Sequence, residues 1–263
     1  MTAELFVEER HRLILENLRR DGRVSVKHLS DTMAVSAVTI RSDLRVLEES
    51  GQLKRTYGGA VAVTNEVVTP DLSFEVRQRS HHAEKDAIAR AAARRVEDGF
   101  AVMLDASTTA FALIPYLKQR QRLIVVTNGL MVAHSLLDSP HITVLLPSGR
   151  LRRDSISLVG APDKLPDVHI NIGFFGTRGI SAQTGITDSD PDEAAMKRAM
   201  IEHCVSVCVV AHHDKLEKVA PFAFARLERV RTIFTTRQAN SDAVANYRAH
   251  GVEVELVGTT RGR

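Results

Sequence analysis

The segment VSVKHLSDTMAVSAVTIRSDLRVLEESGQLKRTYGGA, residues 24–60, decides the fold of the N-terminal part of the chain. Its apolar residues recur at intervals of three and four, as on one face of a helix. The first predicted helix has Val26, Leu29 and Met33 on this face, and the second has Ala37, Ile40, Leu44 and Leu47. Ser36 precedes the second helix and is placed as its N-cap. Two amphipathic helices joined by a tight turn predict a helix-turn-helix.

The polar face of the second predicted helix has side chains that donate hydrogen bonds to base edges and phosphates in a DNA major groove. The DNA-contacting residues that we assign to this helix are Ser36, Val38, Thr39, Arg41, Ser42 and Arg45. Arg41 and Arg45 lie one helical turn apart. A structural helical hairpin with a solvated charged face has the same periodicity, so the periodicity alone leaves both interpretations open.

The residues that follow favour DNA binding. Residues 52–63 contain basic side chains and the pair Gly58-Gly59, which is a turn signal between two short strands. A basic hairpin directly after a recognition helix is a wing, which lies along the DNA backbone or the minor groove. The predicted contacts of this wing are Lys54, Arg55 and Tyr57.

The segment VSAVTIRSDLRVLEESGQLKRTYGGA resembles the N-terminal signature of the DeoR family of bacterial transcriptional regulators. The resemblance implies that double-stranded operator DNA is a partner. One position departs from the family pattern, because two adjacent arginines are usual there and this chain has Arg41 followed by Ser42. We expect this difference to change the operator sequence or a phosphate contact and not to abolish binding.

A chain of 263 residues is long enough for a small domain and a larger one with its own core. The sequence predicts a winged helix-turn-helix domain at residues 1–60, a linker at 61–79 and an α/β domain at 80–263. A net charge of +3 does not by itself identify a nucleic-acid binder. Because the N-terminus lacks a leader pattern and no apolar run approaches about 20 residues, we expect a cytoplasmic protein without membrane contact.

From residue 80 onward, helices alternate with strands that are apolar throughout, such as FAVMLDA, RLIVVTN and SVCVVA. This pattern predicts a mostly parallel sheet with helices on both faces, so the fold class is α/β. In such sheets ligands bind to the loops that leave the carboxyl ends of the strands. We therefore expect the binding site to lie in these loops.

Polar residues follow several of the predicted strands. Three successive hydroxyls, Ser107, Thr108 and Thr109, precede a helix and make a good anion cradle, whereas capping that helix requires only one. The next two strands end in 127–129 (TNG) and 148–150 (SGR), and later loops supply 176–178 (GTR) and Lys215. Their recurrence at successive strand ends predicts one polar pocket.

Five passages resemble the sensor domain of the DeoR family, whose fold is shared with ribose-5-phosphate isomerase, glucosamine-6-phosphate deaminase and coenzyme A transferases. They are AEKDAIARAAARRVEDGFAVMLDASTTA, IVVTNG, GFFGTRGISAQTGIT, DEAAMKRAM and VVAHHDK. In that fold the hydroxyl-rich loop and a lysine hold a sugar phosphate. The effector contacts that we predict from the resemblance and the loops together are Lys85, Asp105, Ser107, Thr108, Thr109, Asn128, Arg150 and Lys215.

Three positions near the predicted pocket depart from the family pattern. Asn171 and His212 stand where aspartate is common, and Arg150 replaces the second glycine of a Gly-Gly pair. Arg150 adds a positive group, so these departures favour an effector that is unusual for the family and more anionic.

The sequence also contains residues that could form a catalytic site or a metal site. Asp188, Asp190, Asp192 and Glu193 resemble a catalytic acid group, but we interpret them as a solvated acidic loop before a helix. Histidines and cysteines at 81–82, 204 and 212–213 show no metal-ligand spacing, so the sequence predicts no metal and no cofactor.

The sequence therefore predicts a DNA-binding regulator that is not an enzyme. We expect a homo-oligomer, a dimer or a tetramer, that represses a carbohydrate catabolic operon until a phosphorylated sugar binds. The alternative is a sugar-phosphate isomerase or deaminase fused to a helix-turn-helix. An activator would use the same residues as a repressor.

Overall fold

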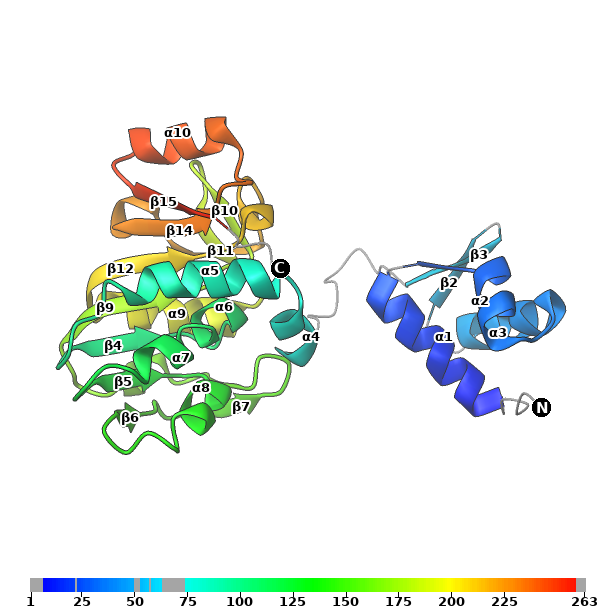
Figure 1. Cartoon of the computed structure of the whole chain (residues 1–263), viewed down its shortest axis with the longest axis horizontal. Helices are drawn as coiled ribbons and strands as arrows, with labels where there is room; N and C mark the ends of the chain where they lie inside the picture. Colours follow the sequence, from blue (N-terminus) through cyan, green and yellow to red (C-terminus); the bar gives the residue numbers. More distant parts are fainter. Residues whose placement is uncertain (1–6, 22, 50–52, 57, 63–73, 259–263) are drawn as a thin grey trace. The chain divides into compact units, whose positions relative to one another are not determined.

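The structure, a computed structural model, describes residues 7–21, 23–49, 53–56, 58–62 and 74–258. The chain divides into two compact units, residues 1–70 and 71–263 (Figure 1). Of the predicted linker at 61–79, residues 63–73 lie outside the described part of the chain. Residues Phe74–Arg79 of that range form helix α4, which the sequence did not predict.

The first unit combines three helices with a three-stranded antiparallel sheet. Its helices are α1 (Val7–Asp21), α2 (Val26–Met33) and α3 (Ala37–Glu49). Its strands, in the spatial order β1-β3-β2, are β1 (Arg23–Ser25), β2 (Leu53–Thr56) and β3 (Gly59–Ala62). The helix-turn-helix predicted from the sequence is α2 with α3, and the predicted wing is the hairpin of β2 and β3.

The two apolar stripes predicted for these helices form the core of the first unit. Their buried members are Val26, Leu29, Met33, Ile40, Leu44 and Leu47. Leu53 and Ala60 of the hairpin belong to the same cluster. The wing is therefore packed onto the helix pair that it follows.

Two polar interactions fix the position of α3. Ser36 Oγ accepts a hydrogen bond from the Thr39 backbone N–H at 3.1 Å, which confirms the predicted N-cap. Arg10 of α1 donates from Nε and from a second guanidinium nitrogen to the buried carboxylate of Asp43, at 2.9 and 3.1 Å. A forked guanidinium matches a carboxylate in this way, so it orients α3 as well as holding it.

The second unit is built on a seven-stranded parallel sheet. Its strands are β4 (Ala101–Leu104), β5 (Ile124–Thr127), β6 (Thr143–Leu145), β9 (Ile170–Phe175), β12 (Cys204–Val210), β14 (Thr232–Thr236) and β15 (Glu253–Val257). Its α-helices are α4, α5 (His82–Ala93), α6 (Thr108–Phe111), α7 (Ile114–Leu117), α8 (Leu130–Ser135), α9 (Pro191–Glu202) and α10 (Ser241–Ala249). Short 3-10 helices are η1 (Pro162–Lys164), η2 (His213–Lys215) and η3 (Leu227–Arg229).

The order of the strands across this sheet is β15-β14-β12-β9-β4-β5-β6, and each neighbouring pair is parallel. The chain runs from β4 outward to β5 and β6, and then crosses to β9 on the other side of β4. The strand order thus reverses between β4 and β9. At such a switch point the loops after the two strands diverge, which leaves a crevice for a ligand.

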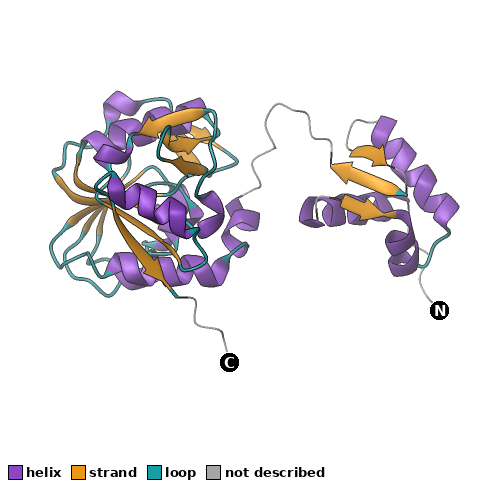
Figure 2. Ribbon diagram, turned by 90° about the horizontal axis from the view of Figure 1, so that it is seen from above, coloured by secondary structure: helices purple, strands orange, loops and turns teal. Residues whose placement is uncertain are grey.

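Helices cover both faces of the sheet, as the uniformly apolar strands predicted (Figure 1, Figure 2). Along β4, Val102 and Leu104 belong to the cluster of α5 to α8, whereas Ala101 and Met103 belong to the cluster of α9 and α10. This alternation follows from the two-residue period of a strand. Among the described residues, no helix combines the length and the apolar composition needed to cross a bilayer.

Smaller elements surround the carboxyl end of the sheet and were not predicted. They are a hairpin of β7 (Arg150–Arg152) and β8 (Ser157–Val159), and a three-stranded sheet of β10 (Gly179–Ser181), β11 (Gly185–Asp188) and β13 (Phe222–Ala225). The sequence also missed α10 and β15. The segment between β4 and β5 holds two short helices, α6 and α7.

Candidate functional site

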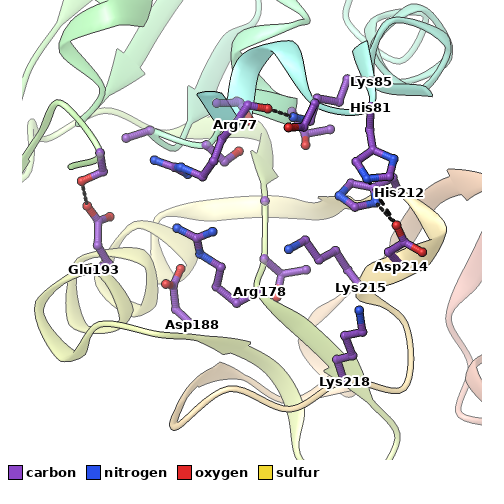
Figure 3. Close-up of a pocket in the computed structure, with 18 of the residues that line it drawn as sticks. Arg77, His81, Lys85, Arg178, Asp188, Glu193, His212, Asp214, Lys215 and Lys218 are labelled. Carbon is purple, nitrogen blue, oxygen red and sulfur yellow. Dashed lines mark hydrogen bonds and ion pairs between the residues drawn. The ribbon is translucent and has the colours of Figure 1, made fainter. Parts of the chain in front are cut away.

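A cavity of about 300 Å³ lies where the loops after β4 and β9 diverge. Side chains from the segment 77–85, from α6, from the loop after β9, from α9 and from the loop after β12 line it (Figure 3). Among the side chains that line it are Arg77, His81, Lys85, Ser107, Thr108, Thr109, Ser155, Arg178, Asp188, Glu193, Lys197, His212, Asp214, Lys215 and Lys218. Of the polar segments predicted at the strand ends, 107–109, 176–178 and Lys215 line this cavity, whereas 127–129 and 148–150 do not.

The hydroxyl loop after β4 forms one wall of this cavity. Ser107 is the N-cap of α6, and its Oγ accepts a hydrogen bond from the Ala110 backbone N–H at 3.1 Å. Thr108 and Thr109 are buried and line the cavity as well. Gly176 of the neighbouring loop approaches closely, since a Cβ built there would lie 2.3 Å from Ser107 Oγ. Glycine at this position therefore allows the two loops to meet.

Basic side chains gather around the hydroxyl loop. Lys85 is buried, and its Nζ donates a hydrogen bond to the backbone carbonyl of Arg77. Burial, together with the positive charges of Arg77, Lys215 and Arg178, lowers the pKa of Lys85 to about 8. The pKa of Lys215 is lowered by burial and by Arg178. Cations that lower one another's pKa in this way are stabilised when an anion lies between them.

A buried ion cluster supports the floor of the cavity. Lys197 Nζ lies 2.7 Å from Asp188 Oδ2 and 2.9 Å from Asp105 Oδ2, and it donates to the Gly176 carbonyl at 2.9 Å. Burial acts to lower the pKa of Lys197, but Asp105 and Asp188 outweigh it and raise that pKa. Burial likewise opposes ionisation of Asp188, and Lys197 overcomes it, so the pKa of Asp188 is lowered. Lys197 and Asp188 are therefore charged and paired near neutral pH.

The acidic residues at 188–193 are not the solvated loop that the sequence predicted. Asp188 is the buried last residue of β11, and Glu193 is buried in the first turn of α9. Glu193 Oε1 accepts hydrogen bonds from the Ser155 and Ser157 hydroxyls, each at 2.5 Å. Asp190 caps α9 by accepting from the Asp192 and Glu193 backbone N–H groups. Burial against other loops was not visible in the sequence of this segment.

The structure brings five of the eight predicted effector residues to the cavity wall, namely Lys85, Ser107, Thr108, Thr109 and Lys215. The other three do not line it. Asp105 lies behind the wall and accepts hydrogen bonds from the Ser107 and Gly176 backbone N–H groups. Asn128 is buried and donates to the Leu158 carbonyl at 3.3 Å, and Arg150 pairs with Asp192 on the surface.

Sequence reasoning missed three basic residues of this site, Arg77, Lys197 and Lys218. Arg77 lies on α4, inside the range that was predicted to be a linker. Lys197 lies on α9, four residues after Glu193 and between the buried Met196 and Met200. The sequence does contain a signal for Lys197. Glu193 and Lys197 lie one helical turn apart on a helix face that is otherwise apolar, and such a face packs toward the core.

His212 is one of the positions that depart from the family pattern, and it lies in the cavity wall. Its ring stacks on that of His81, with centroids 4.1 Å apart and planes 12° apart. Burial and the neighbouring charges of His81 and Lys215 lower the pKa of His212 to about 3. The imidazole of His212 is therefore neutral at pH 7.

In the first unit, the predicted recognition face of α3 is turned to solvent. Val38, Arg41, Ser42 and Arg45 are exposed, while Thr39 is half-buried beside the cap at Ser36. On the wing, Arg55 is exposed and its backbone N–H donates to Glu48 of α3 at 2.8 Å. Tyr57 and the side chain of Lys54 lie outside the described part of the chain. An exposed helix face with two arginines one turn apart has the form of a major-groove reader.

Both halves of the chain match family models. Residues 10–66 match the DeoR-like helix-turn-helix domain, and residues 80–237 match the DeoR C-terminal sensor domain. The chain belongs to the DeoR family. It is a DNA-binding transcriptional regulator, and the fold class predicted from the sequence is confirmed.

Relatives within the DeoR family resemble this chain over nearly its whole length. The regulator GolR of Listeria innocua is 31% identical over 96% of this chain and 99% of its own. The repressor GlcR of Bacillus subtilis is 31% identical over 98% and 100%, and the glycerol-3-phosphate regulon repressor of Escherichia coli K12 is 29% identical over 94% and 98%. Among solved structures, the chain is similar to ribose 5-phosphate isomerase A of Methanocaldococcus jannaschii, with a TM-score of 0.40 and 16% identity over 52% of this chain and 55% of that one.

Proposed function

We propose that this regulator represses an operon for carbohydrate catabolism and that a phosphorylated sugar bound in the cavity of the second unit relieves the repression. The observation that carries the proposal is the set of basic residues around the hydroxyl loop. Besides the paired Lys197, the basic residues of the wall are Arg77, Lys85, Arg178, Lys215 and Lys218. The buried Lys85 and the half-buried Lys215, both with lowered pKa values, lie next to three hydroxyl residues and suit a dianionic phosphate.

The names of the relatives support the same class of effector. One relative is named for the glycerol-3-phosphate regulon, and another is named as a repressor. We infer by analogy that this chain responds to a small phosphorylated polyol or sugar. The acceptor-rich residues Asp188 and Glu193 lie in the same wall and are placed to accept hydrogen bonds from the hydroxyls of such a ligand.

Relief of repression requires the effector to bind one state of the protein more tightly than the other, typically by 1–3 kcal/mol of coupling free energy. We infer that the DNA-binding units act in a cytoplasmic homo-oligomer that reads repeated half-sites. Arg41 and Arg45 would contact bases and backbone, and the basic residues of the wing would contact phosphates.

A sugar-phosphate isomerase is the second candidate, because Asp188, Glu193 and Lys197 line the same cavity. A general base works best when its pKa lies near the working pH. The pKa of Asp188 is lowered and that of Lys197 is raised, so both groups stay charged at pH 7 and neither is suited to transfer a proton. The pairing supports a sensor over a catalyst. Turnover of ribose 5-phosphate by the purified protein would reverse that preference.

The experiment begins with a DNA duplex that the full-length protein selects from a random pool. Its affinity is then measured with and without a panel of sugar phosphates and the unphosphorylated parent sugars. We expect one phosphorylated compound to weaken DNA binding and its parent sugar to have no effect. Equal effects of phosphorylated and free sugars, or no effect of any compound, would contradict the proposal.

Thr108→Val tests the assignment of the hydroxyl loop. Because a hydrogen bond to a charged group contributes about 1.5–3 kcal/mol, we expect this variant to need roughly 10- to 150-fold more effector while it binds DNA normally. Thr143→Val on the exposed edge strand β6 is the matched control. A Thr108→Val variant that responds like the wild type would remove this loop from the effector site.

A further inference from the structure

Three imidazoles and two carboxylates meet at one side of the cavity. His81 and Glu84 come from the beginning of α5, and 212–214 (HHD) follows β12, so the two segments are about 130 residues apart in sequence. His81, His212 and Asp214 line the cavity (Figure 3). The proposed phosphate contacts on the hydroxyl loop and the surrounding lysines and arginines do not include this group.

The distances within the group suit a common bound ion. Asp214 Oδ2 lies 3.3 Å from His81 Nε2 and 3.8 Å from His212 Nδ1. Bonds of 2.0–2.2 Å to a tetrahedral ion place ligand atoms about 3.4 Å apart. The distances from Asp214 to the two histidine nitrogens are therefore close to those between ligands of one ion.

Hydrogen bonds from the remaining two residues orient these ligands. Glu84 Oε1 lies 2.8 Å from His81 Nδ1, which leaves His81 Nε2 as the free lone pair. His213 Nδ1 lies 2.8 Å from Glu84 Oε2, and His213 Nε2 lies 3.1 Å from Asp214 Oδ1. Metal-binding histidines commonly have a carboxylate behind them in this way, because it fixes the tautomer and the ring orientation.

A separate observation concerns His212. His212 is only 7% exposed, and its side-chain Nδ1 has no hydrogen-bond partner among the described residues. Burying a polar atom without a partner is unfavourable. His81, which faces it, has a φ of 53°, a left-handed backbone conformation that costs a non-glycine residue energy. Both features are those of a site that is prepared for a ligand.

We propose that His81, His212 and Asp214 bind one divalent transition-metal ion and that Glu84 and His213 position these ligands. Two imidazoles and one carboxylate suit Zn²⁺ or Co²⁺ and leave a coordination position open toward the cavity. Glu84 and Asp214 contribute two negative charges, which offset the nearby Lys85 and Lys215.

The stacked rings of His81 and His212 define a conformational step. An ion bound to both residues lies near the plane of each ring, whereas the planes are now only 12° apart at a centroid distance of 4.1 Å. One imidazole must therefore rotate about its Cβ–Cγ bond when the ion binds.

The test uses the untagged full-length protein and metal alone, without an effector. We expect one equivalent of Co²⁺ to bind with the visible absorption of a four- or five-coordinate site, and one equivalent of Zn²⁺ to displace it. His212→Phe keeps a stacking ring and removes the nitrogen, so we expect at least a tenfold loss of Co²⁺ affinity. Glu84→Gln should weaken binding by about 10- to 100-fold, as is usual for a group that orients a metal ligand.

His82→Phe is the matched control, since His82 is the exposed neighbour of His81. It should bind Co²⁺ like the wild type. The proposal is overturned if the wild type shows no saturable binding, or if His212→Phe and the wild type bind equally well. Thermal unfolding of each metal-free variant separates loss of the site from loss of the fold. The readout is independent of the proposed sugar phosphate, so a failure here leaves the effector assignment intact.

Discussion

The ammonium of Lys197 lies 2.9 Å from the carboxylate of Asp105, although the two residues are 92 positions apart in the chain (197 − 105). This contact ties α9 to the end of β4, next to the hydroxyl loop. Both side chains are at least 95% buried. A charge pair in such a position helps to fix the geometry of the cavity, because neither group has water as an alternative partner.

Lys197→Met should destabilise the second unit by about 3–5 kcal/mol, since it leaves the carboxylates of Asp105 and Asp188 buried without their cation. Urea denaturation followed by circular dichroism measures the effect on the unfolding transition of this unit. Lys164→Met on the exposed helix η1 is the control and should change stability by less than about 0.5 kcal/mol. Equal stability of the two variants would show that the ion cluster is dispensable.

Gly176→Ala should deform the hydroxyl loop, because the added Cβ would lie 2.3 Å from Ser107 Oγ and 2.4 Å from Ser107 Cβ. We expect a loss of about 1–3 kcal/mol in the free energy of unfolding, as for other overpacked sites. Weaker binding of inorganic phosphate, measured by calorimetry, should accompany it. Gly258→Ala is the control, since its nearest neighbours would be 3.9 Å away. Normal phosphate binding by Gly176→Ala would contradict the close packing of the two loops.

Phosphate affinity should depend on pH through Lys85, whose pKa is lowered to about 8. The lysine is charged below that pH and neutral above it, so its attraction for phosphate is present below pH 8 and lost as the pH rises. The second ionisation of a phosphate ester near pH 6 sets the lower limit. We therefore expect the highest affinity between about pH 6 and 8, and a decline of up to about tenfold per pH unit above it.

Calorimetry with a phosphate monoester, such as glycerol 3-phosphate, between pH 6 and 9.5 measures this profile. Lys85→Gln should bind more weakly at pH 7 and lose the decline that begins near pH 8. The lowered pKa of Lys215 then accounts for any shallower decline that is left. A wild-type affinity that stays constant from pH 7 to 9.5 would argue against Lys85 as a phosphate ligand.

Arg41→Ala should weaken binding to the selected DNA duplex by about 5- to 150-fold, the range expected for loss of a base contact of 1–3 kcal/mol. Fluorescence anisotropy at fixed salt measures it, and phosphate binding by the second unit should not change. Arg12→Ala, an exposed arginine on α1, is the control. Unchanged affinity of Arg41→Ala for the duplex would remove this face of α3 from the DNA interface.

Periodicity in the sequence was sufficient for the helix-turn-helix. The stripes on α2 and α3 are local, since each residue is placed by its own helix, and the N-cap Ser36 directly precedes the helix that it begins. The hydroxyl loop was also predictable, because Ser107, Thr108 and Thr109 directly follow an apolar strand. Local sequence patterns do not predict short elements whose conformation depends on contacts with distant parts of the chain. The helix α4 and the strands β10 and β11 were missed for that reason.

Contacts between distant segments decided the rest of the site. Glu193 and Asp188 belong to a segment that looks solvated in sequence, yet both are buried beneath loops that arrive from elsewhere in the chain. Asn128 and Arg150 follow strands as predicted, but β5 and β6 lie on the far side of β4 from the switch point, and neither residue reaches the cavity. Strand order is a property of the assembled sheet, so the sequence did not reveal it.

The sequence by itself determined the two domains, the helix-turn-helix and the hydroxyl loop, because each depends on residues that are neighbours along one helix or at one strand end. Only the tertiary structure decided which loops share a cavity. It placed Lys197 between two aspartates and brought His81 against 212–214 across the end of the sheet. Charge pairing, burial and ring stacking act through space, and they are fixed when the chain crosses from β6 to β9 and reverses the strand order.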